Sequence, residues 1–363
     1  MSSMFRDPTE RTFAISMWVS SFSAGAVIGP LVGGFLISYF WWGSVFLAGV
    51  PVMLLLMALG PLLLPEFRDP EARPIDYASA FLSLIAVLSF IYGVKEWAEY
   101  GLSLTVLATI AAGIAFGVFF FRRQKVLNNP FVDLSLFKSP VFSLSLAING
   151  LGIFFMFGAF VFVAQYLQLV AGLTPLKAGL WSLPSAVAFT FVSMLTPKLA
   201  SRIPAANLIA GGLALSVLGF IILAFAWDLY SVVASSIIFF VGFTPVVTLT
   251  TNFIVSSAPP ERAGIASALS ETSGELGGAL GIACLGSLLT AVYRSQMFDE
   301  LPRDLTPELA AAARSTLGGA VEASNQLAPE AGIELLGLAR GAFLDGFHIT
   351  AIVAAVALAI LAA

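Results

Sequence analysis

Ten apolar runs follow one another along the chain, and most are long enough to cross a lipid bilayer. They lie at about 14–38, 43–64, 77–97, 102–121, 141–169, 177–198, 206–226, 229–255, 263–292 and 347–363. A spanning helix needs about 20 apolar residues, and within hydrocarbon only helices and closed barrels satisfy every backbone polar group. With 59% hydrophobic and 10% charged residues, the chain is predicted to be an all-α, polytopic membrane protein with about ten transmembrane helices.

The basic residues are distributed unequally between alternate loops. Eleven Lys and Arg residues fall in one set of loops, and only Lys95 and Lys177 fall in the short loops between them. Because basic loops stay in the cytoplasm, the first span is expected to start there. The segment at about 295–346 is then an external loop, and we expect it to form one or two short amphipathic helices on the membrane surface or on the helix ends.

The run from Ala263 to Arg294 carries two acids, Glu271 and Glu275, at membrane depth. A rise of about 1.5 Å per residue places Glu275 about 18 Å from the start of this run. An ionised acid there costs about 2.5 to 3.5 kcal/mol on insertion scales, which makes an intramembrane acid a candidate functional residue. The alternative is a helix interface in which the acids pair with basic groups, but the other predicted spans contain no Lys or Arg at membrane depth to provide them, since Lys95, Lys177 and Lys198 lie at span ends.

The spacing of the two acids suggests a chemical role. Residues four apart share one face of a helix, so Glu271 and Glu275 lie in one stripe with Gly274 and Gly278. Two such carboxylates disfavour double ionisation and should titrate as a unit. The pair could hold a proton and release it when a cation arrives, while the glycines leave room for another helix or a ligand.

The first run contains the motif GAVIGPLVGG. Gly25, Gly29 and Gly33 fall on one helix face, with Pro30 and Gly34 beside them. No strand precedes the motif, so it does not fit a nucleotide-binding loop. The glycines permit close helix packing, and Pro30 is expected to bend the helix because it removes a hydrogen bond.

Two other runs supply candidates for a substrate cavity. The fifth run is rich in aromatic side chains, which could contact a flat lipophilic cation by cation–π interaction or simply face lipid. The eighth run is expected to be interrupted at Gly242 and Pro245, and broken helices with polar side chains are where transporters build sites. The candidate cavity residues are Asn149, Phe154, Phe157 and Asn252.

The sequence contains no metal-ligand cluster, nucleophile elbow or nucleotide loop. We therefore expect neither an enzyme nor a bound metal or cofactor, and no nucleic-acid partner. The last apolar run, counted from Ile349, stops at Ala363 after fifteen residues, fewer than a spanning helix needs, so the chain is expected to be a fragment.

Taken together, these segments resemble the fourteen-spanning drug:proton antiporters of the major facilitator superfamily, which export quaternary ammonium compounds and methyl viologen. GAVIGPLVGG looks like the antiporter motif of that family's fifth span. PPERAGIASALSETSGELGGALGIA is similar to its thirteenth span, where the membrane-embedded acids would correspond to Glu271 and Glu275. The turn KEWAEYGL is also like the one after the family's seventh span.

The resemblance implies major facilitator-type helical bundles containing spans five to fourteen, with four helices absent before Met1. Residues 1–66 would be a two-span remnant of the N-terminal bundle, 67–139 would hold two linking spans, and 140–363 would form the six-helix C-terminal bundle. The implied function is proton-coupled antiport of lipophilic organic cations across the inner (plasma) membrane, by a monomer when full length. Its partners would be a cationic small molecule, protons and the lipid bilayer. A transporter of another small solute and a non-transporting truncated product remain alternatives.

Overall fold

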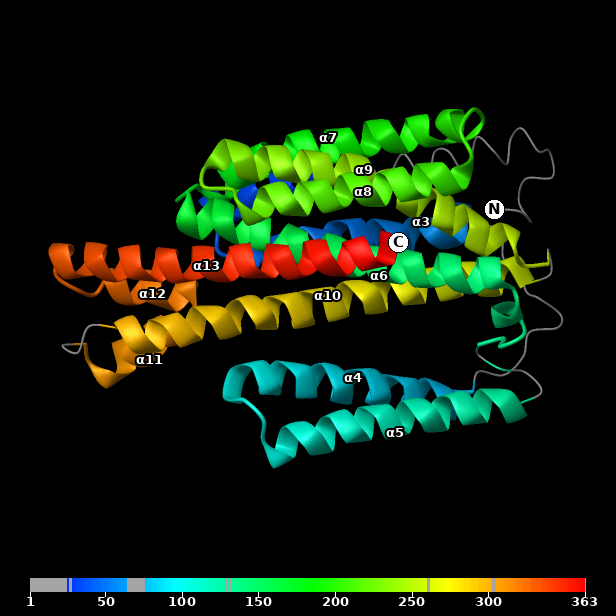
Figure 1. Ribbon diagram of the computed structural model, residues 1–363, viewed down its shortest axis with the longest axis horizontal. Coiled ribbons are helices and arrows are strands. Elements are labelled where there is room, and N and C mark those ends of the chain that lie inside the picture. The colour runs from blue at the N-terminus through cyan, green and yellow to red at the C-terminus, as the bar shows by residue number, and fades with distance from the viewer. Residues whose placement is uncertain are drawn as a thin grey trace.

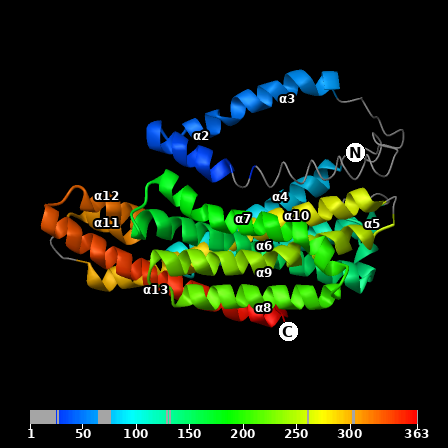
Figure 2. The same ribbon diagram turned by 90° about the horizontal axis from the view of Figure 1, so that it is seen from above.

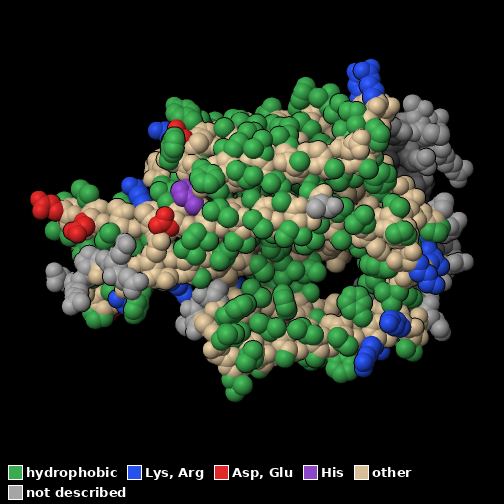
Figure 3. Space-filling model, in the orientation of Figure 1, with side chains coloured by type: hydrophobic (Ala, Val, Ile, Leu, Met, Phe, Trp, Pro, Cys, Tyr) green, Lys and Arg blue, Asp and Glu red, His purple; other side chains and the backbone are tan. Residues whose placement is uncertain are grey.

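The structure, a computed structural model, describes residues 25, 28–63, 76–127, 130, 132–259, 262–301 and 305–362. Every regular element within these ranges is a helix, and the long helices run side by side with their axes nearly parallel (Figure 1). In a space-filling view, hydrophobic side chains cover the flanks, most visible Lys and Arg lie at one end, and visible acids lie at the other (Figure 3). This is the surface expected of a protein surrounded by lipid.

Nine helical segments in the described part of the chain are long and apolar enough to cross a membrane. They are Ser44–Leu62, Tyr77–Trp97, Leu104–Val126, Pro140–Val170, Pro175–Ala200, Ala205–Ala224, Leu229–Ser256, Ala263–Phe298 and Pro329–Ala362. Of the first predicted span, the shorter apolar helix Ile28–Tyr39 is described, and most of the remainder lies outside the described residues. The prediction of an all-α, multi-pass membrane protein is confirmed.

Six long helices form the main bundle. They are α6 (Pro140–Gln165), α7 (Pro175–Ala200), α8 (Ala205–Ala224), α9 (Leu229–Ser256), α10 (Ala263–Glu300) and α13 (Pro329–Ala362). Within the bundle, α6 packs against α9 and α10, α8 packs against α9 and α13, and α7 packs against α9. Phenylalanine rings fill the interior, including the stacked pair Phe239 and Phe243.

The earlier helices lie outside this bundle. The hairpin of α4 (Tyr77–Tyr100) and α5 (Leu104–Val126) lies along α10, which α4 contacts (Figure 1). The short α2 (Ser44–Leu47) and α3 (Gly49–Leu63) run apart from the other helices (Figure 2). Most large hydrophobic side chains of α2 and α3 are exposed.

The predicted bounds of the segment at about 295–346 and the predicted start of the last span at 347 are wrong, although short helices do form within this segment as expected. The helix α10 continues to Glu300, two short helices follow, α11 (Pro307–Ser315) and α12 (Leu317–Ser324), and α13 already begins at Pro329. The first half of α13 is amphipathic rather than uniformly apolar, so a search for continuous apolar runs misses it. Its buried row, Leu335, Ala339, Ala342, Phe343 and Gly346, packs into the bundle.

Arg340 and Asp345, two of the charged residues in the first half of α13, have partners. Arg340 Nε donates to the carbonyl oxygen of Leu169 at 3.1 Å, and Gln296 Nε2 donates to Asp345 Oδ2 at 2.9 Å. At 34 residues, α13 is about 50 Å long, longer than the roughly 30 Å hydrocarbon core. The helix therefore projects beyond the membrane, together with α11 and α12.

The predicted interruption of the eighth span is also wrong. The helix α9 continues through Gly242 and Pro245 without a break. Gly242 lies against the backbone of Gly212 and Ser216 in α8, and proline is tolerated in membrane helices when neighbouring helices support the backbone.

Candidate functional site

Helix α10 has a glycine face that packs directly on α6. A methyl group added at Gly277 would overlap the carbonyl oxygen of Gly150, and one at Gly281 would overlap that of Phe154. Only hydrogen atoms at these positions let the two backbones approach so closely. The predicted glycines Gly274 and Gly278 lie against the side chains of Ile153 and Phe157 of α6, so they too serve contact with another helix, one of the two uses that the sequence allowed.

Glu271 and Glu275 lie beside this glycine face, and both are exposed on the surface of the described structure. Neither makes a hydrogen bond or an ion pair with any residue in the described ranges. The ion pairs within those ranges join Arg123 to Asp76 and Arg262 to Asp133. The alternative in which a basic side chain neutralises the acids therefore finds no support in this part of the chain.

A buried polar layer connects the first half of α6 to the second half of α9. Asn149 is 1% exposed, and its Nδ2 donates to the hydroxyl oxygens of Thr250 and Thr251, each at 3.1 Å. On α10, Ser273 Oγ donates to the carbonyl oxygen of Leu146 at 3.5 Å. These groups connect the helices to one another, and Asn149 is engaged within the helix interface.

A cavity of about 370 Å³ opens in the other half of the bundle, between α6, α7, α8 and α9. Of the four predicted cavity residues, Phe157 lines it, while Asn149, Phe154 and Asn252 do not. The sequence reasoning missed α7, which contributes Trp181, Ser185 and Phe189 to the wall. Their spacing of four residues, which places them along one face of a helix, is a signal that could have identified them.

The glycine motif of the first helix is split between two faces. Gly34 is buried against the backbone of Pro175 and Leu176 at the start of α7, and the carbonyl of Pro30 lies against Gly179. A Cβ atom at Gly25, Gly29 or Gly33 would meet no atom within 4 Å in the described structure. The contact with α7 is therefore made by the row that contains Pro30 and Gly34.

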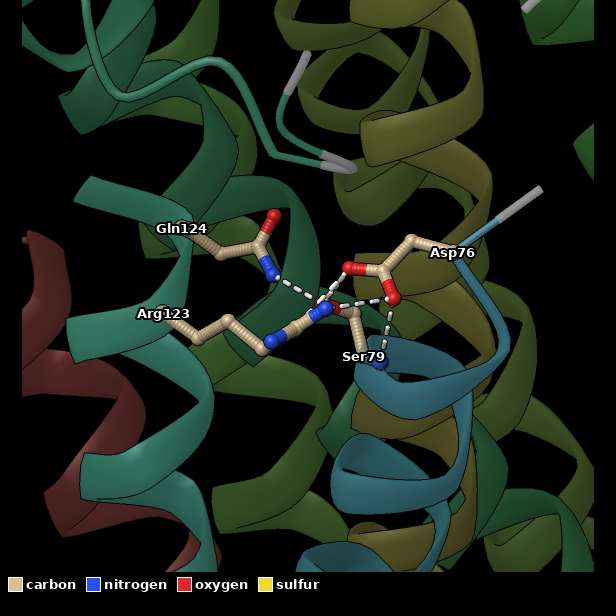
Figure 4. Close-up of polar contacts among 4 residues, drawn as sticks. All are labelled: Asp76, Ser79, Arg123 and Gln124. Atoms are coloured by element: carbon tan, nitrogen blue, oxygen red, sulfur yellow. Dashed lines mark hydrogen bonds and ion pairs between the residues drawn. The ribbon is translucent and has the colours of Figure 1, made fainter. Parts of the chain in front are cut away.

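A network of side chains closes the open end of the α4–α5 hairpin (Figure 4). Arg123 Nη2 donates to Asp76 Oδ1 at 2.9 Å, Ser79 Oγ donates to Asp76 Oδ2 at 2.6 Å, and Gln124 Nε2 donates to Ser79 Oγ at 2.7 Å. The hydrogen bond from Arg123, with those from Ser79, holds the pKa of the Asp76 carboxyl well below its usual range. Gln124 Oε1 also accepts from the backbone N–H of Val132 at 3.2 Å, which ties the following loop to the hairpin.

The same loop is tied to the start of α10. Arg262, the residue before α10, forms an ion pair with Asp133, and its Nη1 donates to Ser135 Oγ at 2.6 Å. Asp133 Oδ1 accepts from the backbone N–H of Ser135 at 2.9 Å. Through this loop, the α4–α5 hairpin is connected to the helix that carries Glu271 and Glu275.

Within the described ranges, no group of three His, Cys, Asp or Glu side chains could hold a metal ion. The arrangement offers an apolar, aromatic cavity, two exposed carboxylates on a helix of membrane-spanning length and helices that pack through glycine. Such features can bind an apolar or cationic molecule and exchange protons.

The chain is similar to several known membrane proteins. The sequence profile of the Major Facilitator Superfamily matches residues 1–282. Multidrug efflux pump LfrA of Mycolicibacterium smegmatis is 41% identical over 97% of this chain and 70% of its own length. Methyl viologen resistance protein SmvA of Salmonella typhimurium is 33% identical over 94% of this chain and 69% of its own length. Multidrug resistance protein Stp of Mycobacterium tuberculosis is 31% identical over 84% of this chain and 57% of its own length. The chain therefore belongs to the major facilitator superfamily.

Proposed function

We propose that this multi-pass protein of the cell membrane exports lipophilic organic cations in exchange for protons. The observation that carries the proposal is the acid pair, Glu271 and Glu275, which lies on a membrane-depth helix without a basic partner among the described residues. Its relatives LfrA and Stp are named for multidrug efflux and resistance, and SmvA for resistance to methyl viologen. Methyl viologen is a flat aromatic dication, a compound that two carboxylates would attract.

The proposed mechanism is alternating access. Protons entering from outside neutralise the pair, and on the cytoplasmic side a cation displaces them. Exchange follows because proton and cation compete for the same carboxylates. The close contact between the first helix and α7, at Gly34, would help to close the path while the protein changes state.

A transporter of anionic solutes would instead need cationic groups in its cavity. No Lys or Arg lines the cavity between α6 and α9, which favours a neutral or cationic compound. Uptake of an anionic and a cationic dye of similar size, compared in the same vesicles, would separate these two classes.

The test is proton-driven efflux of ethidium or methyl viologen in membrane vesicles. We expect Glu271→Gln with Glu275→Gln to lower the rate at least about tenfold, since neutral amides bind neither a proton nor a cation electrostatically. The matched control is Glu308→Gln, which removes an exposed acid from α11 outside the predicted spans. Unchanged efflux in the double variant would remove the pair from the mechanism, and no proton-driven efflux by the unmodified protein would contradict the proposed function.

A further inference from the structure

We propose that the cavity between α6, α7, α8 and α9 binds the aromatic ring of the transported compound, and that Ser185 hydrogen bonds to a polar substituent on that ring. This inference rests on the proposed function and adds to it the place of the uncharged part of the compound. The acid pair would bind the charge, while this cavity within the bundle would bind the ring.

The walls of the cavity suit a flat aromatic molecule. Its aromatic lining residues are Phe157, Phe160, Trp181, Phe189, Phe220, Phe239 and Phe240. Several rings already meet edge to face, as in the pair Phe189 and Phe240 with centroids 6.2 Å apart, and an inserted ring would find similar partners. The volume of about 370 Å³ lies within the range of small-molecule pockets.

Ser185 differs from the other serines of the wall. The hydroxyl of Ser182 donates to the carbonyl oxygen of Ala178, and those of Ser235 and Ser236 donate to that of Val232. Ser185 is 6% exposed and lines the cavity, and its hydroxyl has no hydrogen-bond partner among the described residues. Among the described residues, the fully enclosed hydroxyls without a partner are those of Ser44 and Thr350, so the hydroxyl of Ser185 is open to the cavity, where a polar group on a bound ring would satisfy it. A lipid acyl chain has no such group, so the cavity fits a substituted aromatic compound better than a lipid tail.

Phe157 lies between this cavity and α10, the helix that carries the acid pair. The side chain of Phe157 lines the cavity. Its ring also lies against Gly278 of α10, since a Cβ atom added to Gly278 would be 3.1 Å from Phe157 Cδ2. Gly278 follows Glu275 by three residues, about one helical turn. A compound with its ring in the cavity could therefore extend its cationic end past Phe157 toward α10.

The first experiment fills the cavity. We would measure equilibrium binding of ethidium to the purified protein in lipid nanodiscs, for Ala186→Phe and Val187→Phe. Ala186 lines the cavity, whereas its neighbour Val187 is 56% exposed and does not. We expect Ala186→Phe to weaken binding about tenfold, because the added ring occupies the ligand's volume, and Val187→Phe to leave binding unchanged. Equal affinities in the two variants would overturn the proposal.

A second variant covers the case in which Ala186→Phe does not fold. Phe189→Ala removes a wall ring instead of adding one, and we expect binding about fivefold weaker from the lost ring contact. Unchanged binding in Phe189→Ala would also overturn the proposal.

The role of Ser185 is tested by matched ligands. Ethidium carries two amino groups on its ring system, and a phenanthridinium analogue that lacks them has the same shape and charge. We expect Ser185→Ala to weaken binding of ethidium about fivefold, the effect of one hydrogen bond, and to leave the analogue unchanged. An equal effect on both ligands, or none on either, would refute the hydrogen bond.

Transport and binding together separate the two proposals. If the protein binds ethidium in this cavity but shows no proton-driven efflux, the proposed function fails and the cavity assignment stands. If it exports ethidium while Ala186→Phe behaves like Val187→Phe, the function stands and the cavity assignment fails. If lipids with brominated acyl chains quench Trp181 in a variant without the other tryptophans, and ethidium does not relieve the quenching, the cavity holds a lipid tail and the proposal is wrong.

Discussion

Arg123 donates two hydrogen bonds to the carboxylate of Asp76, from Nε to Oδ2 at 3.1 Å and from Nη2 to Oδ1 at 2.9 Å. Asp76 precedes α4, and Arg123 lies in the last turn of α5. This two-pronged contact has the geometry that makes arginine–carboxylate pairs specific. The contact joins the start of α4 to the end of α5 at the open end of the hairpin, where the loop that leads to α6 begins.

We expect Asp76→Asn to lower the thermal unfolding midpoint at pH 7. Arg123 holds the folded pKa of Asp76 below its usual value, so the stabilisation is complete above the unfolded pKa of about 3.9 and is lost as the pH falls through the folded pKa. The difference from the unmodified protein should therefore shrink below about pH 4. Thermal scans between pH 3 and 8 would measure this difference in unfolding midpoint. The control is Glu322→Gln, because Glu322 is an exposed acid of α12. A difference that persists undiminished at low pH would show that the ionised carboxylate of Asp76 is not the source of the stabilisation.

We expect Asn149→Leu to destabilise the bundle by about 1 kcal/mol, the size of interhelical hydrogen bonds in membranes. The substitution removes both hydrogen bonds to Thr250 and Thr251. The matched control is Asn252→Leu, because Asn252 is exposed near the same end of α9. Equilibrium unfolding in mixed micelles would compare the two variants. A smaller loss for Asn149→Leu than for Asn252→Leu would show that the polar layer does not hold α6 to α9.

The contact between α6 and α10 should tolerate no methyl group at its closest point. We expect Gly277→Ala to cost about 1 to 3 kcal/mol from overpacking, because the new Cβ would overlap the carbonyl oxygen of Gly150. Gly286→Ala, on the same helix, should be neutral or slightly stabilising, since no atom lies within 4 Å of its added Cβ in the described structure. The readout is the unfolding midpoint of each variant, and similar midpoints would contradict the packing described.

The glycines of the first helix should also differ in their tolerance of larger residues. We expect Gly34→Leu to separate the first helix from α7, because its side chain would meet the backbone of Pro175 and Leu176. Gly29 has open space around it in the described structure, so Gly29→Leu should separate the two helices less. Cysteine crosslinking between the first helix and α7 would report the separation. Equal crosslinking in both variants would show that Gly34 does not make the contact.

The hydrophobic runs were enough to predict the class of protein and most of its spans. Lipid imposes a strict rule, since a helix that crosses it must be long and apolar. This rule can be applied to a sequence without coordinates. The same rule failed for the segment before residue 347, because the amphipathic turns of α13 are stabilised by packing against neighbours rather than by lipid. A different inference failed for α9, where Pro245 was expected to break the helix although α8 supports its backbone.

The sequence by itself was enough to place Glu271 and Glu275 on one face of a helix of membrane-spanning length, because helical periodicity and bilayer thickness are fixed. Which groups surround a given side chain is decided by contacts between residues far apart in the chain. Only the tertiary structure placed Asn149 against Thr250 and Thr251 and Ser185 in the wall of a cavity. These relationships depend on how the helices cross and rotate, which the residues of one helix do not specify.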